Sequence, residues 1–83
     1  MKMFIELYAS LMPLLPPGKE RFRREINVAD EYTVQQLIEQ LKIPPEQAHI
    51  VLINGNFVDP INRATHQIKA GDTMSVWPPV AGG

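Results

Sequence analysis

The feature that most constrains the fold is one predicted helix that begins with a capping motif. The segments before and after it alternate between apolar and polar residues, as strands do. Thr33 can cap a helix, and Gln36 stands three residues later, at the spacing of a capping box. The apolar residues that follow repeat at helical spacing: Val34, Leu37, Ile38 and Leu41. A helix is therefore predicted from about Val34 to Lys42, where Pro44 and Pro45 stop it.

Two alternating segments precede this helix and predict a hairpin. In the first, one face of a strand carries Met3, Ile5, Leu7 and Ala9, and the other carries Lys2, Phe4, Glu6 and Tyr8. The second runs from Arg21 to Val28 with Phe22, Ile26 and Val28 as its apolar set, and Arg24 interrupts that face. Between them, the prolines and the glycine of the segment from Ser10 to Gly18 predict a loop. Its apolar residues are expected to fold over the end of the core: Leu11, Met12, Leu14 and Leu15.

The segment after the helix predicts further strands joined by tight turns. His49 to Ile53 is a short apolar strand, and Asn54-Gly55 is a strong turn signal. A second turn at Ala70-Gly71-Asp72 leads into a last strand, Thr73 to Trp77, with Met74 and Val76 facing inward. The order predicts an α+β domain, a small mixed sheet with one main helix packed across it as the crossover between two parallel strands.

Composition excludes several classes of function. A net charge of −1 disfavours nucleic acid as a partner, and the apolar runs are too short to cross a membrane. The first residues lack the pattern of a signal peptide, so we expect a cytoplasmic protein. The absence of cysteine removes thiolate chemistry, and the two serines and two histidines form neither a triad nor a paired metal motif. We therefore expect no enzymatic activity, no bound cofactor and no metal site.

The last residues differ in kind from the domain, which we expect to span residues 1–77. The tail, residues 78–83, consists of Pro78, Pro79, Val80, Ala81, Gly82 and Gly83. The proline pair favours a stiff exit from the last strand, and the small residues after it are slender and bendable. At about 3.3 Å per residue, the tail reaches roughly 20 Å from Trp77, far enough to enter another protein's active site.

A terminal glycine suits chemistry at its own carboxylate. Without a β-carbon, Gly83 can pass a narrow channel and present an open carboxylate. A free carboxylate is a poor electrophile, so it needs activation, for which adenylation by ATP in a partner enzyme is the obvious route. Displacement of AMP by sulfur then gives a thiocarboxylate, which requires no cysteine in the carrier.

The chain resembles the MoaD/ThiS family of ubiquitin-like sulfur carriers, which have the β-grasp fold. The resemblance covers nearly the whole chain and rests on these segments in order: Met3 to Ala9, the capped helix after Thr33, Val51 to Gly55, Lys69 to Asp72, and the tail. The sequence Pro78 to Gly83 is similar to the branch formed by the small subunit of molybdopterin synthase. Trp77 and the proline-rich Met12 to Gly18 loop depart from that branch.

This resemblance implies partners as well as a role. They are a ubiquitin-activating-type adenylyltransferase, a desulfurase or rhodanese-type sulfur donor, and the large subunit of molybdopterin synthase. Gly83 as thiocarboxylate would deliver the sulfur of molybdopterin, and the chain would be the non-catalytic subunit. Sulfur supply for thiamin or a tungsten cofactor remains an alternative, as do a ubiquitin-like modifier without sulfur transfer and a nucleic-acid-binding β-grasp domain.

Three aromatic residues are candidates for the partner interface. Phe4, Tyr8 and Trp77 occupy strand positions opposite the inward-facing sets. They are predicted to form an exposed apolar patch beside the tail, and such patches usually mark interfaces.

Overall fold

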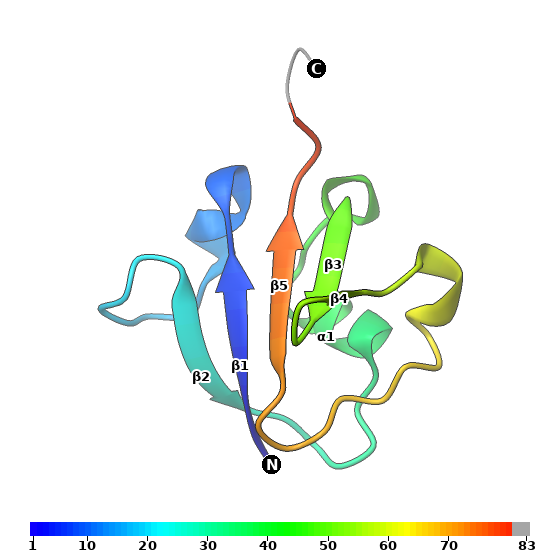
Figure 1. The fold of residues 1–83 in the computed structure, drawn as a ribbon. Helices are drawn as coiled ribbons and strands as arrows, with labels where there is room; N and C mark the ends of the chain where they lie inside the picture. Colours follow the sequence, from blue (N-terminus) through cyan, green and yellow to red (C-terminus); the bar gives the residue numbers. More distant parts are fainter. Residues whose placement is uncertain (81–83) are drawn as a thin grey trace.

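The computed structural model describes residues 1–80, so the predictions for Ala81, Gly82 and Gly83 lie outside the described residues. Five strands form one mixed sheet: β1 (Lys2–Leu7), β2 (Arg23–Asn27), β3 (Ile50–Ile53), β4 (Asn56–Phe57) and β5 (Thr73–Trp77). A helix, α1 (Val34–Gln40), lies across one face of the sheet (Figure 1). Within residues 1–80, no helix is long and apolar enough to cross a membrane.

The strand order is β2-β1-β5-β3-β4, with the first and last strands of the chain side by side at the centre. β1 and β5 run parallel, whereas β2 and β3 each run antiparallel to their central neighbour. The segment containing α1 joins β2 to β3, which point the same way on opposite sides of the central pair. The predicted crossover therefore exists, but it links strands that are not neighbours.

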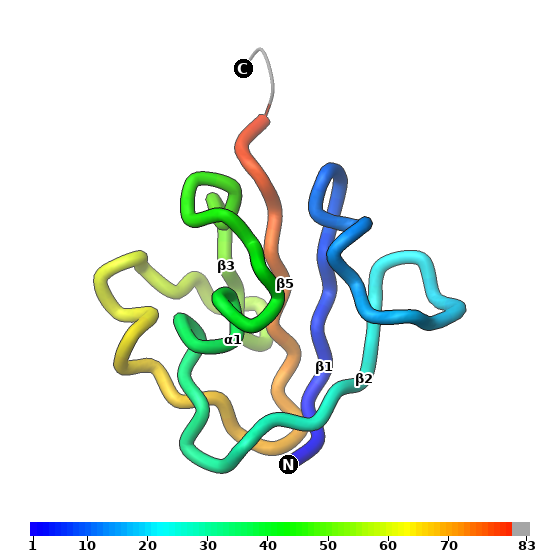
Figure 2. The backbone as a smooth tube through the Cα atoms, turned by 180° about the vertical axis from the view of Figure 1, so that it is seen from behind, coloured from blue at the N-terminus to red at the C-terminus, as the bar shows by residue number. Residues whose placement is uncertain are grey.

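The core lies between α1 and the sheet. In the view from behind, α1 lies in front of the strands (Figure 2). The inward positions of β1 and β5 are completely buried: Met3, Ile5, Leu7, Met74 and Val76. The predicted helical stripe faces them and is also buried: Val34, Leu37, Ile38 and Leu41. Because α1 covers only one face of the sheet, the other face stays open to solvent.

The predicted capping box is present at the start of α1. The Thr33 hydroxyl accepts a hydrogen bond from the Gln36 backbone N–H at 3.1 Å, and the Gln36 side chain accepts one from the Thr33 backbone N–H at 2.8 Å. The helix ends at Gln40, two residues earlier than predicted. Lys42 has a φ of 60°, a left-handed conformation that stops the helix before the prolines do.

The proline-rich segment is more ordered than predicted. A 3-10 helix, η1 (Ala9–Leu14), contains Pro13, and Leu11 is only 2% exposed in the core. Leu14 and Leu15 also pack against the core, as predicted. Ala9 is exposed, with a φ of 52°, because the chain leaves the sheet there, so its predicted inward position is wrong.

The hydrogen bonds of Arg24 explain why a charged residue interrupts the apolar face of β2. Its guanidinium donates hydrogen bonds to the carbonyls of Pro16, Gly18 and Glu20, and so holds the loop before the strand. A β-carbon at Gly18 would collide with the Arg24 side chain, so another residue there would push the guanidinium away from these carbonyls. The strand begins at Arg23, two residues later than predicted, because this loop continues through Phe22.

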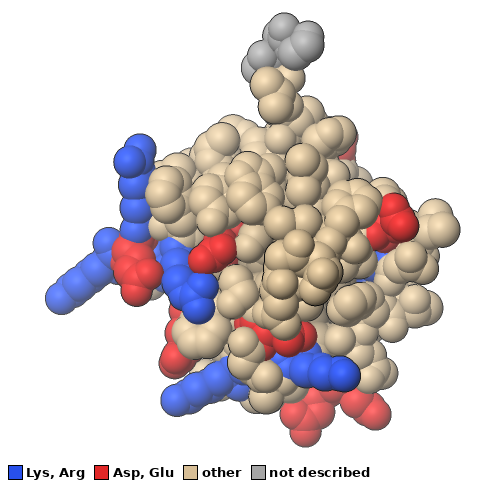
Figure 3. Space-filling view, viewed as in Figure 1, with Lys and Arg blue, Asp and Glu red and all other residues tan. Residues whose placement is uncertain are grey.

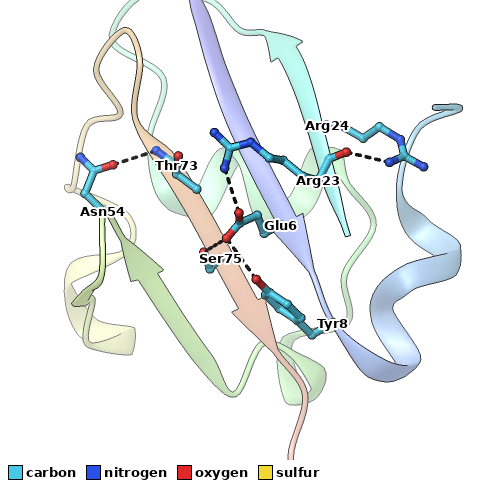
Figure 4. A network of polar contacts seen from close by, with 7 residues as sticks. All are labelled: Glu6, Tyr8, Arg23, Arg24, Asn54, Thr73 and Ser75. Atoms are coloured by element: carbon cyan, nitrogen blue, oxygen red, sulfur yellow. Dashed lines mark hydrogen bonds and ion pairs between the residues drawn. The ribbon is translucent and has the colours of Figure 1, made fainter. Parts of the chain in front are cut away.

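The turn between β3 and β4 has the predicted geometry. Asn54 and Gly55 both have positive φ, 51° and 83°, as a type I′ turn requires. The Asn54 side chain also accepts a hydrogen bond from the Thr73 backbone N–H at 2.9 Å, which ties the turn to the start of β5 (Figure 4).

Candidate functional site

The tail leaves the sheet from a central strand. The Trp77 carbonyl accepts a hydrogen bond from the His49 N–H at 3.1 Å, and the residues after it, Pro78 and Pro79, have no N–H to donate. Residues 78–80 continue past the upper ends of the neighbouring strands (Figure 1). Pro78 is partly buried, but Pro79 is exposed and Val80 is 82% exposed, so the chain projects from the body after Pro78.

A groove of about 380 Å³ lies at the base of the tail. Its lining is mostly apolar and comes from the beginning of η1 and the end of β5: Ala9, Ser10, Trp77, Pro78, Pro79 and Val80. The left-handed backbone at Ala9 turns the chain away from β1 here, which opens the groove beside the tail.

An aromatic cluster, Tyr8, Phe22 and Trp77, lies beside the groove on the open face of the sheet. The rings of Tyr8 and Trp77 are stacked, with centroids 4.3 Å apart and planes within 3°. Phe22 packs at 5.0 Å from Tyr8. All three residues are partly exposed. The structure therefore brings together two of the three predicted interface residues at the base of the tail.

Phe4 is on the same face but apart from this cluster. It lies four residues before Tyr8 on β1, a separation of about 13 Å along a strand. Its ring is instead covered by the Arg23 guanidinium at 4.2 Å. The predicted patch is thus divided, with Phe4 near the charged side of the sheet and the aromatic cluster near the tail.

Three apolar residues that sequence reasoning missed extend this surface. Ile50 pairs with Trp77 in the sheet, Leu52 is next outward on β3, and Phe57 on β4 is 55% exposed. The alternation of β3, with Val51 and Ile53 inward, was the signal that could have found the first two. Figure 3 shows that the middle of this face below the tail is free of charge, whereas charged side chains gather toward its left and lower edges and acidic groups lie at its right edge.

A polar network anchors Tyr8 from the sheet side (Figure 4). The Glu6 carboxylate accepts hydrogen bonds from Ser75 at 2.8 Å, Arg23 at 2.8 Å and the Tyr8 hydroxyl at 3.1 Å. Burial alone would raise the pKa of the Glu6 carboxyl, but the three donors and the Arg23 charge outweigh it and lower the pKa below its usual value. Burial and the Glu6 charge raise the pKa of Tyr8, so its hydroxyl stays protonated and donates.

We expect Glu6→Gln to destabilise the domain by about 1 kcal/mol near neutral pH, because it weakens hydrogen bonds to a charged acceptor. Since the folded pKa is lowered, this contribution is complete above the unfolded pKa, near 4.5, and is lost as pH falls through the folded value. Urea unfolding of both proteins across the acidic range measures it.

The matched control for this prediction is Glu25→Gln. Glu25 lies on the same face, but it is more exposed and its only ion pair, among the described residues, is to Lys2 at 3.9 Å. We expect its effect to be within about 0.5 kcal/mol at every pH. A Glu6→Gln difference that does not shrink in acid would contradict the network as described.

The serines and histidines are not combined into a reactive group. Ser75 bonds to Glu6, Ser10 lines the groove, His49 is exposed and His66 is half-buried in a loop. Among residues 1–80, no group of three His, Asp or Glu side chains is placed to hold a metal ion.

A mixed sheet with one helix across it and a tail leaving its central strand defines a ubiquitin-like β-grasp protein. The family model of the ThiS family matches residues 5–83, and the chain belongs to this family. The predicted resemblance to the MoaD/ThiS sulfur carriers and the predicted fold class are therefore confirmed. Family membership also supports a small carrier protein and not an enzyme. No curated protein matched the chain.

Solved structures of similar fold cover almost the whole chain. SAMP1 from Haloferax volcanii is 22% identical, with 100% of both chains covered and a TM-score of 0.67. A protein described as molybdopterin converting factor subunit 1, from Pyrococcus furiosus, is 22% identical over 95% of this chain and 98% of that chain, with a TM-score of 0.67. A chain from the complex of subunits 1 and 2 of the molybdopterin-converting factor from Helicobacter pylori is 22% identical, with 100% of both chains covered and a TM-score of 0.57.

Proposed function

We propose that the chain carries sulfur as a thiocarboxylate on Gly83. The observation that carries this proposal is the tail itself, which leaves a central strand next to an apolar groove and shows Val80 open to a partner. The match to the ThiS family extends through the tail to residue 83. The sequence contains no cysteine, so its own sulfur chemistry has to use another group.

The chemistry has two steps in a partner enzyme, and a third step when the sulfur donor is a persulfide. The Gly83 carboxylate attacks the α-phosphate of ATP, which forms an acyl adenylate and releases pyrophosphate. A sulfur nucleophile from a desulfurase or rhodanese-type donor then displaces AMP. If the donor sulfur is a persulfide, a thiol must afterwards reduce the acyl disulfide, which releases the terminal thiocarboxylate. The chain itself binds no cofactor in this cycle, and we propose the cytoplasm as its location because activation consumes ATP.

The acceptor we favour is the large subunit of molybdopterin synthase. The tail sequence Pro78 to Gly83 supports this branch, and a similar structure comes from a complex of subunits 1 and 2 of a molybdopterin-converting factor. Thiamin and tungsten-cofactor supply would use the same thiocarboxylate. These acceptors are told apart by which purified enzyme consumes the thiocarboxylate in a single-turnover assay.

The expected result of activation is a change in the intact mass of the protein. Incubation with the cognate adenylyltransferase, ATP and a sulfur donor should add the mass difference between sulfur and oxygen, and alkylation should trap one thiol equivalent on Gly83. Omission of ATP is the control. If only the free acid appears under conditions in which pyrophosphate is released, sulfur carriage is wrong.

A ubiquitin-like modifier is the second candidate function. It is favoured by the similarity to a structure described as small archaeal modifier protein 1, which is 20% identical over 95% of this chain and 98% of that chain, with a TM-score of 0.69. In that function Gly83 would form an isopeptide bond to a lysine of a target. The same mass measurement separates the two, because conjugation gives a larger product that alkylation does not label.

A further inference from the structure

A second pocket lies on the helix side of the domain. It has a volume of about 390 Å³ and is formed by α1 together with two short 3-10 helices, η2 (Pro45–Gln47) and η3 (Pro60–Asn62). Ile38, Pro45 and Pro60 give it an apolar wall. It shares no lining residue with the groove at the tail, and its volume is within the range of small-ligand sites.

Arg63 lines this pocket and is only 6% exposed. Its backbone is fixed in place, because the Arg63 carbonyl accepts a hydrogen bond from the Gln35 N–H at 2.9 Å. Its Nη1 donates to the Ala48 carbonyl at 2.9 Å, but Nε and Nη2 are buried and have no hydrogen-bond partner within residues 1–80. Burial lowers the pKa of the guanidinium, yet an arginine keeps its charge at neutral pH.

The two unpartnered nitrogens lie on one edge of the guanidinium. In arginine, the Nε–H and one Nη2–H point in the same direction, and this fork matches the two oxygens of a carboxylate. A buried cation with two unmade hydrogen bonds is costly to the fold. A bound carboxylate offsets this cost, because it supplies a negative charge and two acceptor oxygens at the spacing of the two nitrogens.

We propose that this pocket binds a carboxylate carried on a short apolar stem. Its oxygens accept from Nε and Nη2 of Arg63, and its stem packs on Ile38, Pro45 and Pro60. Because both nitrogens are buried, binding requires a small turn of the guanidinium toward the pocket. Among residues 1–80 the side chain makes one hydrogen bond, to Ala48, so no other hydrogen bond has to break for that movement. Glu46 is exposed at the pocket and is negatively charged, like the proposed ligand, so its repulsion weakens binding of the carboxylate.

Butyrate titrated into the full chain tests the proposal, with the Arg63 Nε–H signal followed by NMR at constant ionic strength. We expect butyrate to shift this signal saturably, and butyramide, of the same shape without charge, to leave it unmoved. Glu46→Gln should tighten butyrate binding roughly two- to fivefold. N-acetylglutamate amide is the second arm: tighter binding than butyrate indicates an acidic side chain of a partner protein, and weaker binding indicates a free small acid.

Three results would overturn the proposal. They are an unmoved Arg63 signal at high butyrate, an equal response to butyramide, and unchanged butyrate affinity in Glu46→Gln. Arg63→Met is a further control, in which butyrate binding should disappear. Because that variant also loses the bond to Ala48, the wild-type and Glu46→Gln titrations decide the matter even if it does not fold.

Discussion

Gly82→Val is expected to leave the domain folded and to slow adenylation of Gly83 by about 100-fold or more, because small misplacements of a reacting group have effects of this size. Gly82 lies outside the described residues, and residue 80 before it already projects from the body. The carboxylate must reach a nucleotide inside a partner's channel. A branched side chain there clashes and excludes backbone angles that glycine alone adopts freely.

ATP–pyrophosphate exchange with the cognate activating enzyme, at matched carrier concentrations, measures this effect. Gly82→Ala is the matched control and should be milder, since one methyl adds less bulk. Deletion of residues 81–83 should remove exchange entirely with little change in the thermal midpoint, because these small residues offer little apolar area to bury. Exchange at the wild-type rate by the valine variant would show that the glycines are incidental.

The elements with strong local periodicity were predictable from the sequence. The stripe from Val34 to Leu41 and the capping box at Thr33 each involve residues within one or two helical turns, so the pattern contains the information. The alternation of β1 and β5 placed Tyr8 and Trp77 on the open face for the same reason. Their ring stacking follows from the pairing of these two strands, which their separate patterns do not specify.

Other features depend on contacts between distant parts of the chain. The Glu6 network joins Ser75 to a strand 69 residues earlier, and no local pattern signals such a pair. Arg24 violates the pattern of its strand because its partners are loop carbonyls. The cover over the Phe4 ring also comes from a distant contact, with Arg23 of β2, whereas the separation of Phe4 from Tyr8 follows from strand spacing alone.

Trp77→Ala is expected to weaken binding of the activating enzyme by about 1 to 2 kcal/mol, roughly 5- to 30-fold in Kd. Trp77 is the residue shared by the aromatic cluster and the groove at the tail, so a partner that holds the tail also covers its ring. Partly exposed aromatic residues at the centre of a contact are enriched among energetic hot spots. Titration of the enzyme with labelled carrier measures the effect, after circular dichroism has shown that the variant is folded.

Phe4→Ala is the matched control, and it tests whether the loss of binding depends on closeness to the tail. Phe4 and Trp77 are both partly exposed aromatics on the same face, but Phe4 lies about 13 Å further from the tail along β1. If binding depends on the tail and its base, Phe4→Ala should change Kd by less than about threefold, and Trp77→Phe should retain most of the affinity because it keeps an aromatic ring against Tyr8. Equal losses from Phe4→Ala and Trp77→Ala would mean that the partner uses the whole open face. In that case the apolar residues of β3 and β4, Ile50, Leu52 and Phe57, belong to the interface as well.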